Sequence, residues 1–167
     1  MGLDVGDERV PEPDLDGAGK GLRVAVVCGR FNSHVTLRLL DGVRRGLAAC
    51  GVLDDDVVEV WVPGAFEIPL AAKTHAATGR CDAVVCVGSV IRGETAHFEY
   101  VAGQCAQGIQ AAGLETGVPV VFGVLTTEDL DQALERSEGE GGHNVGEEGA
   151  RTAVEMARLL AAVRDGT

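Results

Sequence analysis

A histidine that follows a short polar turn is the strongest candidate for chemistry in this sequence. The turn contains Gly93, Glu94 and Thr95, it follows an apolar run that ends at Val90, and His97 comes two residues after it. A strand that leads through such a turn into a helix points free backbone N–H groups at a bound anion. The positive end of that helix favours a neutral imidazole, which accepts a proton near pH 7. These residues predict proton transfer beside an anion such as phosphate; an ordinary surface histidine is the alternative.

Aromatic and charged residues also stand after two other apolar runs and at the end of a short helix. Phe31, followed by Asn32, offers a ring on which a planar ligand can stack. Glu67 lies in a turn framed by two prolines, residues 63–69, where it can accept hydrogen bonds from ligand hydroxyls. Arg136 has the fork that binds a phosphate group. Each also has a structural explanation, respectively a buried ring, a solvated carboxylate and a cation that complements the helix dipole.

The elements that must position these residues follow from hydrophobic periodicity. Valine-rich runs with little polar alternation predict strands buried on both faces at residues 22–28, 57–62, 83–90 and 119–125. Apolar residues at helical spacing predict helices at residues 35–50, 68–78, 97–114, 128–136 and 147–163, the fourth capped by Thr126 or Thr127. Strands that alternate with helices indicate an α/β fold, with a parallel sheet and helices on both faces. The segments after the strands should then meet at the carboxyl edge, where ligands bind in such folds.

The composition limits the class of protein. The 167 residues carry a formal net charge of −12, with 14 Lys and Arg against 26 Asp and Glu, which argues against nucleic acid and anionic membranes as partners. Hydrophobic residues make up 46% of the chain, so most of it is globular, yet no apolar run reaches the length of a membrane span. We expect an acidic, flexible lead over residues 1–21, without a secretory signal, and a single domain over residues 22–167.

The cysteines and histidines predict neither disulfides nor a metal site. The five cysteines are odd in number and form no C-x-x-C pair. We therefore interpret them as reduced residues in or near the core of a cytoplasmic protein. A nucleophilic cysteine is the alternative. The histidines are not spaced as metal ligands with one another or with cysteine, so no metal is expected.

Four stretches of the sequence, taken together, resemble the lumazine synthase family. They are residues 30–32, 62–69, 88–101 and 119–127, and they occur in the family's order. The resemblance implies a flavodoxin-like three-layer α/β/α sandwich around a four-stranded parallel sheet. It also implies a transferase of riboflavin biosynthesis that needs no cofactor. The implied reaction condenses 5-amino-6-(D-ribitylamino)uracil with 3,4-dihydroxy-2-butanone 4-phosphate to 6,7-dimethyl-8-ribityllumazine, releasing phosphate and water.

The same resemblance implies a role for each matching residue. His97 would transfer protons. The phosphate would be bound by Glu94, Thr95 and Arg136. The pyrimidine and its ribityl chain would be bound by Phe31, Asn32, Ala65, Phe66, Glu67, Val90, Ile91 and Phe122. Family sites lie between adjacent subunits of a pentamer or of an assembly of pentamers, so Phe122 and Arg136 would come from a neighbour. Riboflavin synthase is a candidate partner.

One position departs from the family pattern. The loop after the fourth helix usually carries Asn-Lys-Gly or Asp-Lys-Gly, whereas here residues 144–146 are Asn-Val-Gly, with Val145 in place of the lysine. A cation expected near the phosphate or the subunit contact is therefore missing, which leaves more of the phosphate binding to Arg136 and to the turn at Glu94 and Thr95. This change supports an alternative function, a protein of the same fold that binds a lumazine or flavin with weak or no turnover. A mainly structural shell subunit is a third possibility.

Overall fold

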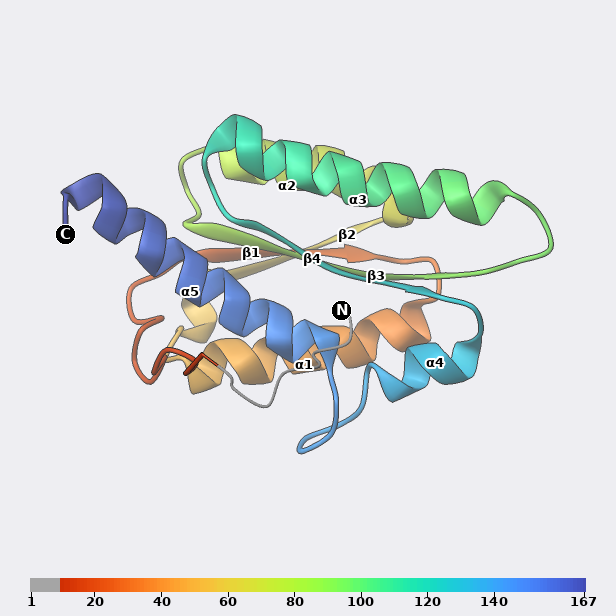
Figure 1. Ribbon diagram of the computed structural model, residues 1–167, viewed down its shortest axis with the longest axis horizontal. Coiled ribbons are helices and arrows are strands. Elements are labelled where there is room, and N and C mark those ends of the chain that lie inside the picture. The colour runs from red at the N-terminus through yellow and green to blue at the C-terminus, as the bar shows by residue number, and fades with distance from the viewer. Residues whose placement is uncertain (1–9) are drawn as a thin grey trace.

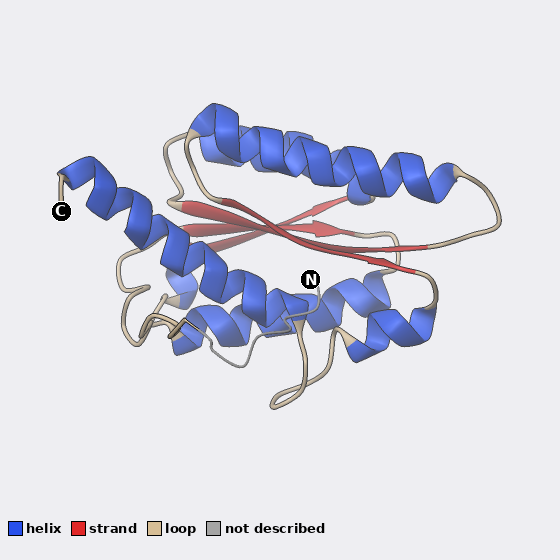
Figure 2. Ribbon diagram, in the orientation of Figure 1, coloured by secondary structure: helices blue, strands red, loops and turns tan. Residues whose placement is uncertain are grey.

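The sheet of the computed structural model, which describes residues 10–167, has four parallel strands. β1 (Val24–Gly29), β2 (Val57–Val62), β3 (Ala83–Ile91) and β4 (Val120–Thr127) lie in the order β2-β1-β3-β4, and their arrows run in one direction (Figure 2). The predicted α/β class and all four strands are confirmed. Burial differs from the prediction, because residues of β2 and β4 are partly exposed whereas β1 and β3 are buried almost throughout. The strand order explains this, since β2 and β4 are the edge strands.

Helices cover both faces of the sheet, which gives three layers (Figure 1). α1 (Ser33–Ala49) and α5 (Val145–Asp165) pack against each other on one face, and α2 (Ile68–Ala77) and α3 (His97–Thr116) pack together on the other. The short α4 (Leu130–Glu135) lies on the side of α1 and α5. All five predicted helices are confirmed. Within residues 10–167, no helix is long and apolar enough to cross a bilayer.

Short elements and caps adjust these boundaries. Two 3-10 helices, η1 (Asp54–Asp56) and η2 (Ala65–Glu67), precede β2 and α2. The predicted cap of α4 is wrong. The cap is Asp129, whose side chain accepts a hydrogen bond of 2.8 Å from a backbone N–H of the first helical turn. Thr126 and Thr127 instead belong to β4, where their backbone still pairs with β3, so neither can begin the helix.

Alternation along β3 separates two hydrophobic clusters, one on each face of the sheet. Val85 and Val87 belong to the cluster shared with α1 and α5, whereas Val84 and Cys86 belong to the cluster shared with α2 and α3. The central strands are therefore held from both sides. The loops that follow the carboxyl ends of these strands are therefore attached to a rigid part of the sheet.

The start of α5 touches α1 so closely that both helices require glycine there. A Cβ on Gly146 would lie 2.1 Å from the carbonyl oxygen of Leu39, and a Cβ on Gly42 would lie 2.0 Å from Oδ1 of Asn144. Asn144 caps α5, since the same Oδ1 accepts hydrogen bonds of 2.9 and 3.2 Å from two N–H groups of the first turn. This contact fixes the end of the loop that begins after Arg136.

The second half of the predicted lead packs against the domain. Leu15 is buried in the cluster shared with α1 and α5, and the N–H of Gly19 donates a hydrogen bond of 2.7 Å to the end of α1. Arg158 of α5 donates to the carbonyl of Lys20 at 2.7 Å. The packed part of the chain therefore begins before the predicted boundary at residue 22. Residues 1–9 of the lead lie outside the described residues.

Candidate active site

A cavity of about 630 Å³, here called the first cavity, opens at the carboxyl edge of the sheet. Its wall is formed by the segments that follow β1, β2 and β3, together with the first turns of α3. Nine of the twelve predicted site residues line it: Phe31, Asn32, Ala65, Phe66, Glu67, Val90, Ile91, Thr95 and His97. Three segments that are far apart in the sequence therefore meet at one place.

The segment after β1 presents an exposed aromatic ring. Phe31 is 73% exposed, and its N–H donates to the carbonyl of Pro63 at 3.1 Å, which ties this segment to the one after β2. Asn32 precedes α1 with a φ of 58°, in the left-handed region that asparagine tolerates. Its side-chain N–H donates to the carbonyl of Ser89 at 3.0 Å. These bonds hold the Phe31 ring beside the cavity, where it is available for stacking.

The segment after β2 is stiffened by its prolines and by η2. Ala65 is buried, whereas Phe66 is 57% exposed and Glu67 is also exposed. A Cβ on Gly64 would lie 3.5 Å from Oε2 of Glu67 and 3.8 Å from Cβ of Phe31, so these two side chains flank the same piece of backbone. A stacking face and an acceptor for hydroxyl groups therefore lie close together.

The segment after β3 brings a hydroxyl and an imidazole to the cavity. His97 is the first residue of α3, as predicted, and it is exposed beside the cavity. Its N–H makes a long hydrogen bond, 3.4 Å, to Oγ1 of Thr95. The first N–H groups of a helix have no partner within the helix, so this turn offers donors to an anion. An imidazole beside such donors can exchange protons with the ligand that they bind.

Besides Pro63, Gly64 and Gly93, which belong to the predicted turns, four residues of the cavity wall were not predicted: Ser89, Phe98, Tyr100 and Val101. Helical spacing could have identified Tyr100 and Val101, because residues three and four positions after His97 share its face. Ser89 carries the single hydroxyl side chain of β3, and this polar residue in an apolar run is a signal that the prediction did not use. Its hydroxyl is buried and has no hydrogen-bond partner among the described residues.

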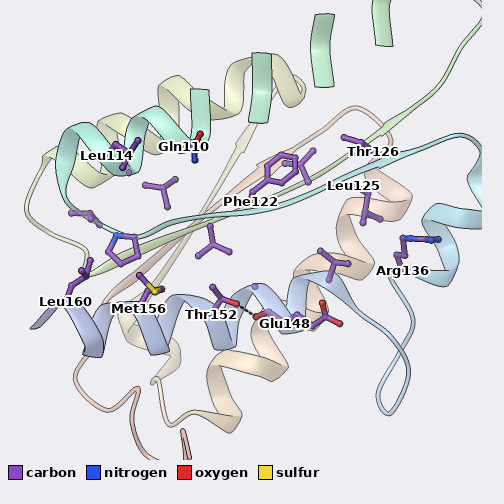
Figure 3. Close-up of a pocket in the computed structure, with 18 of the residues that line it drawn as sticks. Gln110, Leu114, Phe122, Leu125, Thr126, Arg136, Glu148, Thr152, Met156 and Leu160 are labelled. Carbon is purple, nitrogen blue, oxygen red and sulfur yellow. Dashed lines mark hydrogen bonds between the residues drawn. The ribbon is translucent and has the colours of Figure 1, made fainter. Parts of the chain in front are cut away.

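Phe122 and Arg136 line a second cavity, of about 950 Å³, which runs along β4 between α3 and α5 (Figure 3). Arg136 lies at one end of it, and Leu114 and Leu160 lie at the other. Phe122 is 42% exposed, so its ring is not fully packed in the core and can contact a ligand or a neighbouring subunit. Within one chain the predicted site residues are therefore divided between two cavities, and Glu94 lines neither.

The guanidinium of Arg136 is held by its own helix. It donates to the carbonyl of Gln132 at 3.0 Å and lies 3.7 Å from the carboxylate of Glu135. Most of its five N–H donors remain available to an anion. Val145 is close by, because its N–H donates to the carbonyl of Arg136 at 3.0 Å and its side chain lines the same cavity. Where lysine was expected, the cavity wall is apolar.

The cysteines are not placed for nucleophilic chemistry. Burial raises the pKa of Cys28 and of Cys105 to about 12, and it raises the pKa of Cys86 as well. These thiols therefore stay protonated at neutral pH. All five cysteines are free thiols, and none lines the first cavity. Among residues 10–167, no group of three or more His, Cys, Asp and Glu side chains could hold a metal ion.

The first cavity combines groups that can bind a planar molecule, bind an anion and move protons. An exposed ring offers stacking, a carboxylate accepts hydrogen bonds from hydroxyl groups, and an imidazole beside free N–H groups can move protons. The remaining wall is largely apolar, so a few polar groups orient the ligand.

Comparison with protein families identifies these segments as parts of a known family. The family model described as 6,7-dimethyl-8-ribityllumazine synthase matches residues 21–161 of the 167-residue chain. The matched region contains every residue that lines the first cavity, and it also contains Phe122 and Arg136 of the second.

Proposed function

This chain belongs to the 6,7-dimethyl-8-ribityllumazine synthase family of riboflavin biosynthesis, and from that premise we propose that it condenses 5-amino-6-(D-ribitylamino)uracil with 3,4-dihydroxy-2-butanone 4-phosphate. The products are 6,7-dimethyl-8-ribityllumazine, phosphate and water. The observation that carries the proposal is the first cavity, where an exposed ring, a carboxylate and an imidazole line one wall.

The heterocyclic substrate suits the side of the first cavity that contains Phe31. Its pyrimidine ring stacks on the exposed face of Phe31, and the amide of Asn32 meets a polar edge of the ring. Glu67 accepts hydrogen bonds from the ribityl hydroxyls. Val90 and Ile91 supply apolar contacts from the end of β3. Substrate orientation therefore depends on a few polar groups in a mostly apolar wall.

His97 relays protons while the two substrates react. The 5-amino group attacks the ketone, and the carbinolamine that forms loses water to give an imine. Removal of a proton next to the imine lets phosphate leave, and the enol that remains tautomerises to a ketone. The ribitylamino nitrogen attacks this ketone, and loss of a second water completes the new ring. A neutral imidazole can take and return these protons, while Thr95 and the free N–H groups of its turn stabilise the departing phosphate. Much of the acceleration comes from holding two reactive molecules together.

A neighbouring subunit supplies Phe122 and Arg136 in this proposal. Within one chain these residues line a cavity that does not include His97. In a ring where the second cavity of one subunit faces the first cavity of the next, Phe122 covers the pyrimidine and Arg136 reaches the phosphate. Exposed apolar residues along the second cavity, such as Leu114 at 79% exposure, support a subunit interface there.

Turnover by the purified protein tests the proposed reaction. The protein is mixed with both substrates, and the absorbance and fluorescence of the ribityllumazine product are followed. We expect product to form faster than in the absence of protein. Binding of the product or of a flavin without turnover would favour the binding-protein alternative, which Val145 in place of lysine supports. If the protein shows no turnover and binds neither the product nor a flavin, both functions are contradicted.

The assembly is tested separately, by size-exclusion chromatography with light scattering. We expect a pentamer or an assembly of pentamers. A protein that stays monomeric while it turns over substrate would contradict the shared site and would leave the reaction itself standing.

A further inference from the structure

Arg92 lines neither cavity, yet it begins the turn that contains Thr95. Its N–H donates to the carbonyl of Thr127 at 2.9 Å, which extends the contact between β3 and β4 by one residue. The rest of the turn, residues 93–96, is exposed. Apart from bonds within α3, the described residues show one hydrogen bond in this turn, the 3.4 Å contact between His97 and Thr95. The backbone alone therefore supports the turn weakly.

The side chain of Arg92 supplies the missing support. Its guanidinium forms a salt bridge with Glu99 in the first turn of α3, and it lies 4.2 Å from the centroid of the Phe98 ring. Its Nε donates to Oε2 of Glu128 at 2.7 Å. A guanidinium held by two carboxylates and a ring is more constrained than one in a single surface ion pair.

The charges of this cluster indicate a structural tie and not a free phosphate ligand. Hydrogen bonds to Glu99 and Glu128 raise the pKa of Arg92, and the bond from Arg92 lowers the pKa of Glu99. Both shifts favour the charged forms of Arg92 and Glu99, and the guanidinium is already paired with two carboxylates. Glu128 comes two residues before α4, which ends next to Arg136. One side chain thus joins segments that carry parts of both cavities.

We propose that Arg92 is a positioning residue for the phosphate half of the first cavity. By joining the end of β3 to α3 and to the segment before α4, it fixes the turn of residues 93–96. Thr95 and His97 are then oriented before the phosphorylated substrate arrives, which lowers the cost of binding it. The inference rests on the proposed function, because it assigns that turn to the butanone phosphate.

The test compares Arg92→Gln with a matched control, Arg44→Gln. Arg44 is also an exposed arginine between two carboxylates, with Nε 2.7 Å from Glu59 and Nη1 3.1 Å from Asp41, and it lines neither cavity. We expect Arg92→Gln to raise KM for the butanone phosphate and Kd for inorganic phosphate about tenfold, because misplaced binding groups are costly. The KM for the pyrimidine substrate and the Kd of ribityllumazine, which has no phosphate, should change less than about twofold.

The outcomes separate positioning from general stability. Arg92→Lys keeps the charge but loses the planar fork, so it should recover only part of the loss. Equal behaviour of Arg92→Gln and Arg44→Gln would overturn the inference, and so would equal losses for both substrates. A wild-type protein without turnover would contradict the proposed function. In that case calorimetry can still measure how Arg92→Gln changes the Kd for inorganic phosphate. Equal Kd values for the wild type and Arg92→Gln would overturn the inference.

Discussion

The two cavities of this chain are built in different ways. The first gathers the segments after three neighbouring strands, so that Phe31 and His97, far apart in the sequence, reach one space. The second runs along the edge strand β4, where no further strand covers the gap between α3 and α5 and Phe122 stays exposed (Figure 3). The first brings Glu67, Thr95 and His97 beside an exposed ring, whereas the second has Arg136 at one end and also contains Arg164 and the paired His143 and Glu148.

The difference follows from the place of each strand in the sheet. The exit of a central strand is surrounded by other exits, so a single chain can assemble a site there. An edge strand offers a surface that another molecule must cover. If the proposed function holds, neither cavity suffices alone. A variant in either cavity should then lower turnover, and subunits that carry the two variants should complement each other in mixed rings.

Mixed rings should show the largest effect. We expect His97→Ala and Arg136→Ala each to lower turnover about 30- to 100-fold at low substrate, as single catalytic or phosphate-binding groups do, without abolishing it. In rings that mix the two variants, about a quarter of the sites combine an intact first cavity with an intact second cavity. Activity of coexpressed subunits should therefore rise well above that of either variant.

The control for mixed rings is a histidine outside both cavities. His75→Ala on α2 should keep wild-type turnover, alone and in mixtures. Rings that light scattering shows to have formed, but that recover no activity, would contradict a site shared between subunits.

Arg136→Ala alone should affect one substrate more than the other. Loss of charge-assisted hydrogen bonds worth about 2 kcal/mol should raise KM for the butanone phosphate about 30-fold. The KM for the pyrimidine substrate should change less than about twofold, because the proposed site places Arg136 on the phosphate and not on the pyrimidine. Steady-state kinetics with each substrate varied in turn measures both. Arg164→Gln, another cation that lines the second cavity, is the control, and equal effects of Arg136→Ala on both substrates would argue against a phosphate contact.

The sequence predicts much of the first cavity because its determinants are local. The buried valines of β3, the turn at Gly93 and the helix that begins at His97 are contiguous, so periodicity and turn chemistry place the imidazole at the start of α3. The partial exposure of β2 and β4 could not be predicted in this way, because it depends on strand order.

Contacts between distant segments could not be predicted from local sequence patterns either. The bond from Arg92 to Glu128 joins residues 36 positions apart, and only the pairing of β3 with β4 brings them together. The separation of Phe122 from Phe31 likewise depends on which strands are neighbours. The resemblance to a family identifies Phe31 and Phe122 as candidate site residues. Only the structure shows that they line different cavities of one chain.

Phe31→Ala should weaken the first cavity without unfolding the domain. An aromatic stacking contact is worth about 1 kcal/mol, so the Kd of ribityllumazine should rise about five- to tenfold. The melting temperature should stay within a few degrees of that of the wild type, since the ring is 73% exposed. Fluorescence titration and thermal unfolding measure the two effects. Leu70→Ala, 75% exposed and outside both cavities, is the control; a large drop in melting temperature for Phe31→Ala would mean that the ring belongs to the core.

Val145→Lys should give the smallest effect, a gain in the second cavity. Val145 lines that cavity beside Arg136, so an added ammonium group at the start of α5 should attract the phosphate by about 0.5–1 kcal/mol and lower KM for the butanone phosphate about two- to fivefold. Val145 also packs partly against the cluster shared with α1 and α5, so the melting temperature should fall by a few degrees. Val145→Gln separates charge from packing, because it loses the same apolar contact without adding a cation. If both variants change KM equally, charge is not the cause; if neither does, Arg136 and the Thr95 turn already suffice for the phosphate.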